Sequence, residues 1–220
     1  MHKVFTQTGL ICLFILSTFV ANAQFNINTN PFWQGEIEMT DGSIKSGYIQ
    51  VPNIAAERKI AYKSAQNAKS EEIKREKISK IHVISENGKS FFYDNLPMGL
   101  IKKDKVSKKR YLLLAHASNN FVTFYIMSTY KVNGRTGNID FVTKYIQGKD
   151  FPTFSYFMSK GDKKNAKMYY MTKQLGGIKK NAELHFAEDQ NLVEKIKNKE
   201  LKGKDVSEII QTFLDTTENM

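Results

Sequence analysis

Two glutamates, Glu36 and Glu38, are the residues whose spacing first suggests chemistry. In a β-strand, side chains two positions apart point to the same face, so these two carboxylates would lie together. A carboxylate pair beside a groove can serve glycoside hydrolysis. Solvent-facing charge on an edge strand, which discourages association between strands, explains the pair equally well. We favour this second interpretation because it requires no substrate.

Three histidines, His82, His116 and His185, are isolated from one another in the sequence. Only the fold could bring them together as a zinc site or as an acid–base pair. The sequence contains no H-E-x-x-H helix motif and no G-x-S-x-G nucleophile motif. We therefore predict no catalytic residue, no cofactor and no metal ligand.

A cluster of basic residues is the best candidate for a binding surface. It contains Lys102, Lys103, Lys105, Lys108, Lys109 and Arg110, in a segment that we expect to be a loop. With a net charge of +11, the chain should meet anionic lipid or polysaccharide surfaces readily. Nucleic acid is an unlikely ligand, because few aromatic residues interleave with these cations. A solvated turn without a ligand is the alternative.

The amino terminus has the pattern of a secretory signal. An apolar run, Leu10 to Ala21, precedes the small residues of Ala21-Asn22-Ala23, which predicts a signal peptide of residues 1–23 and cleavage before Gln24. The run of about 12 residues is shorter than the roughly 20 that a membrane-spanning helix needs. We therefore expect an exported protein, periplasmic or extracellular, with no transmembrane segment after cleavage. Cys12, the only cysteine, would be lost with the signal, which excludes disulfides and thiolate sites in the mature chain.

Residues 24–172 read as an antiparallel β domain. Trp33, Gly35 and Ile37 alternate with polar residues, which is the period of a strand with one buried face. Asp41-Gly42 then predicts a hairpin turn with positive φ at both central positions, and Ile44 to Val51 would form the second arm. Similar patterns recur along the domain. We expect about eight to ten strands, arranged as a partly closed barrel or a sandwich.

Residues 173–220 read as two or three helices that pack on the sheet. Apolar residues recur at helical spacing, and two capping boxes are predicted, Asn191 with Glu194 and Asp205 with Glu208. The predicted fold class is therefore α+β, with a mainly antiparallel β domain followed by a helical subdomain.

Three features together resemble a group of uncharacterised secreted β-rich proteins common in Bacteroidetes. They are the Ala23-Gln24 boundary, the pattern G-x-I-x-x-x-D-G-x-x-x-x-G-x-I from Gly35 to Ile49, and the tail FAEDQNLVEKIKNKELKGKDVSEIIQTF. The resemblance covers the signal, the first hairpin and the last 40 or so residues. It implies an exported β-rich protein and assigns no catalytic residue.

Three functions are compatible with these observations. The one we prefer is a non-enzymatic envelope protein that binds a partner protein or an anionic envelope component through its loops. A second is a barrel-type carrier of a small apolar ligand, with residues such as Phe121, Tyr125 and Met127 around an internal cavity. A third is a hydrolase, which would require a histidine or the Glu36–Glu38 pair to lie in a cleft beside a second titratable group.

Overall fold

The structure is a computed structural model. It describes residues 31–99, 106–127, 129–133, 136–141, 143–146, 149–152, 155–161, 165–171 and 178–220. The predicted signal peptide, residues 1–23, lies outside the described residues.

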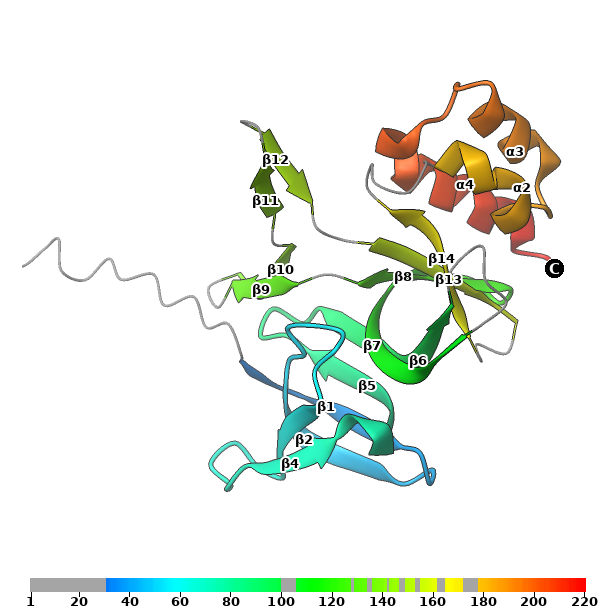
Figure 1. Ribbon diagram of the computed structural model, residues 1–220. Helices are drawn as coiled ribbons and strands as arrows, with labels where there is room; N and C mark the ends of the chain where they lie inside the picture. The colour runs from blue at the N-terminus through cyan, green and yellow to red at the C-terminus, as the bar shows by residue number, and fades with distance from the viewer. Residues whose placement is uncertain are drawn as a thin grey trace, which may run out of the picture.

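Ten strands form one sheet in the order β14-β13-β8-β7-β6-β5-β1-β2-β3-β4 (Figure 1). In chain order they are β1 (Phe32–Met39), β2 (Ile44–Gln50), β3 (Lys59–Lys63), β4 (Glu71–Lys74), β5 (Ile78–Ile84), β6 (Ser90–Gly99), β7 (Val106–Ser118), β8 (Val122–Met127), β13 (Ser155–Lys160) and β14 (Ala166–Met171). Neighbours in this order are antiparallel, and β14 also pairs in parallel with β6. The strands β6, β7, β8, β13 and β14 thereby close into a mixed barrel, so the predicted α+β class with a barrel and carboxyl-terminal helices is confirmed.

The first hairpin forms as predicted, but its turn differs in detail. Gly42 has a φ of +85°, whereas Asp41 does not have a positive φ. The Asp41 side chain instead accepts hydrogen bonds from Ser43 N (2.9 Å) and Ser43 Oγ (2.6 Å). The Met39 amide donates to the Ser43 carbonyl, which leaves three residues in the loop. A three-residue loop needs only its last residue in the left-handed region, and glycine adopts that region without strain.

At Gly35 the backbone of β1 lies very close to β5. A Cβ atom added there would lie 2.0 Å from the carbonyl oxygen of His82. Gly47, the residue paired with Gly35 on β2, is similarly constrained, since its Cβ would lie 2.3 Å from the Lys63 carbonyl oxygen. The first and last glycines of the pattern in the sequence therefore have a packing role in this hairpin.

Several short strands were not predicted or were placed differently. The polar stretch from Ser64 to Glu72, which has no strand-like alternation, ends in β4, the edge strand of the sheet. The apolar segment from Ile139 to Ile146 is divided between two separate hairpins. These are β9 (Tyr130–Asn133) with β10 (Asn138–Phe141), and β11 (Thr143–Ile146) with β12 (Lys149–Pro152).

Two apolar clusters fill the two parts of the sheet. One lies under β1, β2, β3 and β5 and includes Trp33, Ile37 and Tyr93. The other includes Leu113, Tyr125 and Phe157, each fully buried, from three strands of the barrel. Met127 packs against this second cluster, whereas Phe121 packs against the helices. The three residues expected around one carrier cavity are thus divided between two clusters.

The helices lie at the far end of the molecule from β1 and β2 (Figure 1). They are η2 (Ile178–Asn181), α2 (Ala182–His185), α3 (Gln190–Lys197), η3 (Gly203–Asp205) and α4 (Val206–Thr217). A third cluster joins Phe186, Ile196 and Phe213 of this region to Phe124 of β8 and Tyr156 of β13. Asn119, which directly follows β7, also donates from its Nδ2 to Leu214 O of α4 (2.9 Å). Burial of the apolar side chains of this cluster, rather than helix propensity alone, stabilises such short helices.

Neither predicted capping box makes its predicted hydrogen bonds, although Asp205 is the N-cap residue of α4 as predicted. Asp189, and not Asn191, caps α3, because its side chain accepts from Leu192 N at 2.9 Å. Asp205 makes its reciprocal contact with Lys202, whose amide donates to Asp205 Oδ2 at 2.9 Å. The α3 cap therefore lies two residues before the predicted position, whereas Asp205 is the N-cap residue of α4 as predicted but directs its side chain to η3.

Candidate functional site

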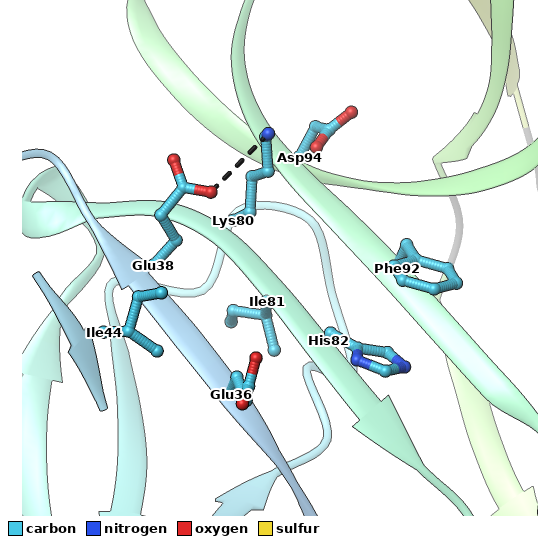
Figure 2. Close-up of a pocket in the computed structure, with 8 residues that line it drawn as sticks. All are labelled: Glu36, Glu38, Ile44, Lys80, Ile81, His82, Phe92 and Asp94. Carbon is cyan, nitrogen blue, oxygen red and sulfur yellow. Dashed lines mark ion pairs between the residues drawn. The ribbon is translucent and has the colours of Figure 1, made fainter. Parts of the chain in front are cut away.

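Four neighbouring strands, β2, β1, β5 and β6, direct alternate side chains to one side of the sheet. We call this surface the acidic–apolar face. Its members are Ile44 and Ser46 of β2, Glu36 and Glu38 of β1, Lys80, His82 and Ile84 of β5, and Ser90, Phe92 and Asp94 of β6. A hollow of about 320 Å³ lies on it (Figure 2). The side chains that alternate with these members point into the apolar cluster of Trp33 and Ile37.

Three large apolar side chains of this face are exposed to solvent. The exposed fractions are 62% for Ile44, 50% for Phe92 and 40% for Ile84. The Phe92 ring stacks on the imidazole of His82, with 4.3 Å between ring centroids and 5° between planes. His82 Nε2 lies 3.2 Å from Ser90 Oγ. Stacking and this contact hold the two rings face to face (Figure 2).

The charged groups of the face are three carboxylates and one ammonium group. Glu38 Oε2 lies 3.5 Å from Lys80 Nζ, and both side chains are largely exposed, so the pair adds little to stability. Ser46 Oγ donates to Glu36 Oε1 at 3.3 Å. The face is therefore acidic in a chain whose net charge is +11.

Asp94 connects this face to the barrel. The buried hydroxyl group of Tyr125 donates to Asp94 Oδ2 at 2.6 Å. Burial, and then the charge of Asp94, raise the pKa of Tyr125. The phenol therefore stays protonated and remains a hydrogen-bond donor. This bond fixes the point at which β6 passes from the exposed face to the barrel interior.

The prediction for Glu36 and Glu38 was correct about the solvent-facing side and wrong about the edge strand. The two carboxylates do share the solvent-facing side of β1, but β1 lies between β2 and β5 and is not an edge strand. Protection of an edge therefore cannot explain them. At the actual edge, Glu71 and Glu72 of β4 pair with Lys45 (2.7 Å) and Lys59.

Three members of the basic cluster belong to a strand and not to the predicted loop. Lys108, Lys109 and Arg110 are exposed residues near the start of β7, because the β6–β7 ladder extends to Val106. Arg110 Nε donates to the Asn95 carbonyl oxygen at 2.9 Å. Lys102, Lys103 and Lys105 lie outside the described residues.

The three histidines lie in three parts of the molecule. His82 belongs to the acidic–apolar face, His116 is an exposed residue of β7 beside the Tyr156 ring, and His185 is buried among the helices. Within the described part of the chain, no three histidine, cysteine, aspartate or glutamate side chains are grouped to hold a metal ion. His82, with Glu36 and Glu38 on the neighbouring strand, is the histidine that the fold brings beside carboxylates.

Sequence reasoning missed the exposed apolar residues of the face. A signal was present in Phe91-Phe92, because two consecutive phenylalanines in a strand must point to opposite faces. Likewise, Ile44 and Ile84 occupy the solvent-facing positions of their strands, next to polar residues. An apolar residue at a strand position where the alternation predicts a polar one is thus the signal that would have identified them.

Comparisons with models of protein families, with curated proteins and with solved structures give no match to this chain. In the part of the chain that the structure describes, no helix is long and apolar enough to cross a membrane.

Buried His185 should make stability depend on pH. Burial, and then the charges of Lys160 and Lys167, lower the pKa of His185 to about 4. In the unfolded chain its pKa would be about 6.5. As pH falls from 7 to 5, the unfolded state binds a proton that the folded state resists, so His185 should cost about 2 kcal/mol of stability. Urea denaturation of the wild type, His185→Gln and His82→Gln at both pH values measures this cost.

We expect His185→Gln to lose about 2 kcal/mol less than the wild type between pH 7 and pH 5. The His82→Gln control, altered on the exposed face, should behave like the wild type. An equal loss for His185→Gln and the wild type would contradict the assignment.

Proposed function

We propose that this protein is a non-enzymatic binding protein whose partner protein docks on the acidic–apolar face. The partner surface would combine apolar side chains with lysine or arginine. The observation that carries this proposal is the exposure of Ile44, Ile84 and Phe92 around a set of carboxylates on one sheet face. Single exposed apolar residues are common, but grouped ones mark interaction surfaces.

The dimensions of the face suit a protein segment. Ile44 on β2 and Phe92 on β6 are separated by three strand spacings of about 4.8 Å, or roughly 14 Å across the sheet. A helix or a strand pair could cover this width. Phe92, held against His82, supplies a rigid aromatic anchor of the kind that dominates interface energies. Glu36 and Glu38 lie between the two apolar ends and would attract cations.

Charge supports a cationic partner over an anionic one at this face. The carboxylates of Glu36 and Glu38 would repel lipid phosphate and acidic polysaccharide, while Lys80 is already paired with Glu38 and Asp94 is buried. Complementary charge increases association rates and selects among partners. An anionic component, which the basic cluster suggests, would have to bind elsewhere on the molecule.

The same geometry argues against hydrolysis by Glu36 and Glu38. Residues two apart on a strand are separated by about 7 Å and point in one direction. A sugar laid on the face would meet both carboxylates from the same side, whereas glycosidases place them on either side of the scissile bond. The hollow is also open, with Phe92 and Ile44 at least half exposed, so water would not be excluded from a reaction.

The alternative of a carrier has less support. Leu113, Tyr125 and Phe157 occupy the described interior of the barrel with no exposed surface. An apolar ligand would have to displace at least one of these side chains. Such a displacement would forfeit core packing that the closed barrel already has.

We also propose that the chain is exported, on the basis of its apolar leader and the Ala21-Asn22-Ala23 sequence. Amino-terminal sequencing of the protein from its native cell should begin at Gln24. Recovery from the cytosol with Met1 attached would contradict export, but it would leave the docking face untouched.

Site-specific photo-cross-linking tests the docking face. Phe92→p-benzoylphenylalanine, placed in the full chain in its native cell, should give a covalent adduct with a protein. Mass spectrometry should find that the cross-linked partner peptide carries lysine or arginine beside apolar residues. Adding Glu36→Gln and Glu38→Gln should reduce the adduct at least about fivefold, because the attraction to those cations is lost.

The matched control is Leu184→p-benzoylphenylalanine, because Leu184 is an equally exposed apolar residue, at 58%, on α2. It should not give the same adduct. The proposal fails if position 184 yields the same products as position 92, or if the loss of both carboxylates leaves the adduct unchanged.

A further inference from the structure

The hairpin of β11 and β12, which we call the arm, stands apart from the rest of the described structure. β11 (Thr143–Ile146) pairs with β12 (Lys149–Pro152) and with no other described strand. The arm projects away from the ten-stranded sheet and from the helices (Figure 1). Two strands without a third strand or a packing surface are only marginally stable in water. The arm would therefore gain stability from a surface that covers it.

One face of the arm combines cations with apolar residues. The register pairs Lys144 with Phe151 and Ile146 with Lys149. Residues two apart on a strand share a face, and so do residues directly opposite each other, so these four positions lie on one face of the arm. This is the composition that the acidic–apolar face requires of its partner. The opposite face of the arm has no cation and consists of Thr143, Tyr145, Asp150 and Pro152.

The spacing of the charged positions matches as well. Lys144 and Lys149 are diagonal neighbours across the arm, which places their positions about 7 to 8 Å apart. Glu36 and Glu38, two residues apart on β1, are separated by about 7 Å. The two lysine positions can therefore align with the two carboxylates, while the apolar positions of the arm meet the exposed apolar residues of the face.

The arm of a chain begins on the opposite side of the sheet from the acidic–apolar face of that chain. The preceding hairpin, β9 with β10, packs through Val132 and Ile139 on the cluster of Trp33 and Ile37, which lies on the core side. Lys89 Nζ also donates to Asn138 Oδ1 at 2.6 Å and holds this hairpin in place. A single residue separates β10 from β11. The face that the arm fits is therefore the face of another molecule.

We propose that the arm of one copy docks on the acidic–apolar face of a second copy of this chain. This inference rests on the proposed function and names the partner. Lys144 and Lys149 of one copy would lie beside Glu36 and Glu38 of the other. When the docking is reciprocal, two arms and two faces close a dimer with twofold symmetry and leave no interface unused.

Charge reversal tests the pairing. Sedimentation of the mature chain, Gln24 to Met220, at low salt should show a dimer whose dissociation constant rises with salt, because ion pairs at an interface are screened. Lys144→Glu with Lys149→Glu should weaken the dimer about tenfold or more, since like charges would then face each other. Glu36→Lys with Glu38→Lys should weaken it by a similar factor.

A chain that carries all four substitutions should recover a dissociation constant within about threefold of the wild type, because opposite charges again meet. A variant that had merely lost its fold would not be rescued in this way. Lys179→Glu with Lys180→Glu, which reverses two exposed charges beside the helices, is the matched control and should change little.

Cross-linking separates this inference from the proposed function. Phe92→p-benzoylphenylalanine in the unlabelled chain, mixed with isotope-labelled wild-type chain, should give an adduct between position 92 and a labelled peptide from residues 143–152. The inference is overturned if the purified chain stays monomeric, if the four substitutions together give no rescue, or if the adduct maps elsewhere.

The proposed function survives such a failure if position 92 in the native cell still gives an adduct with a different protein, and if this adduct depends on Glu36 and Glu38. Without that adduct, the inference and the proposed function fail together.

Discussion

The close approach of β1 to β5, and of β2 to β3, is the constraint on which the first half of the molecule depends. At Gly35 and Gly47 there is no room for a side chain, because the carbonyl groups of β5 and β3 occupy the positions that Cβ atoms would take. This fit sets the register in which Trp33 and Ile37 point into the core. A slip of one residue would reverse both faces of the strand. The position of Glu36 and Glu38 on the solvent side follows from the same fit.

The continuous sheet links this exposed face to the barrel and the helices. Strands β6 and β7 belong to both parts, and the bond from Tyr125 to Asp94 lies at the junction. On the far side, the helices cover the outer surface of β8 and β13 through Phe124, Tyr156 and their neighbours. One side of the molecule therefore has its apolar surface closed by helices, while the acidic–apolar face keeps three apolar side chains in solvent. This contrast is the physical basis of the proposed docking site.

Local features of the fold could be predicted from the sequence. The turns at Asp41-Gly42 and Asn87-Gly88 have short-range signals, and the alternation around Ile37 and the helical stripe of Phe213 follow from periodicity. The pairing of β14 with β6 could not be predicted, because it joins segments far apart in the chain with no local signal. The start of β7 was missed because lysines at Lys108 and Lys109 resemble a loop when the ladder partner is unknown.

The same limit applies to the candidate sites. Glu36 and Glu38 were identified as a pair, but His82 and Phe92 joined them only through strand order. Arg110 was assigned to an anion-binding surface, but its Nε donates to the Asn95 carbonyl oxygen of the neighbouring strand, a contact that spacing along the chain does not reveal. Residue spacing within one strand is readable from sequence; neighbours across a sheet depend on register, which nonlocal packing decides.

The most direct test of the account compares two glycine substitutions in the same sheet. Gly35→Ala should lower the free energy of unfolding in urea by about 3 kcal/mol or more, because its methyl group must displace the His82 carbonyl. Gly99→Ala should change it by less than about 1 kcal/mol, since its methyl group would meet other atoms only at 3.7 Å and beyond. Equal, small effects of both substitutions would contradict the tight placement of β1 on which the acidic–apolar face depends.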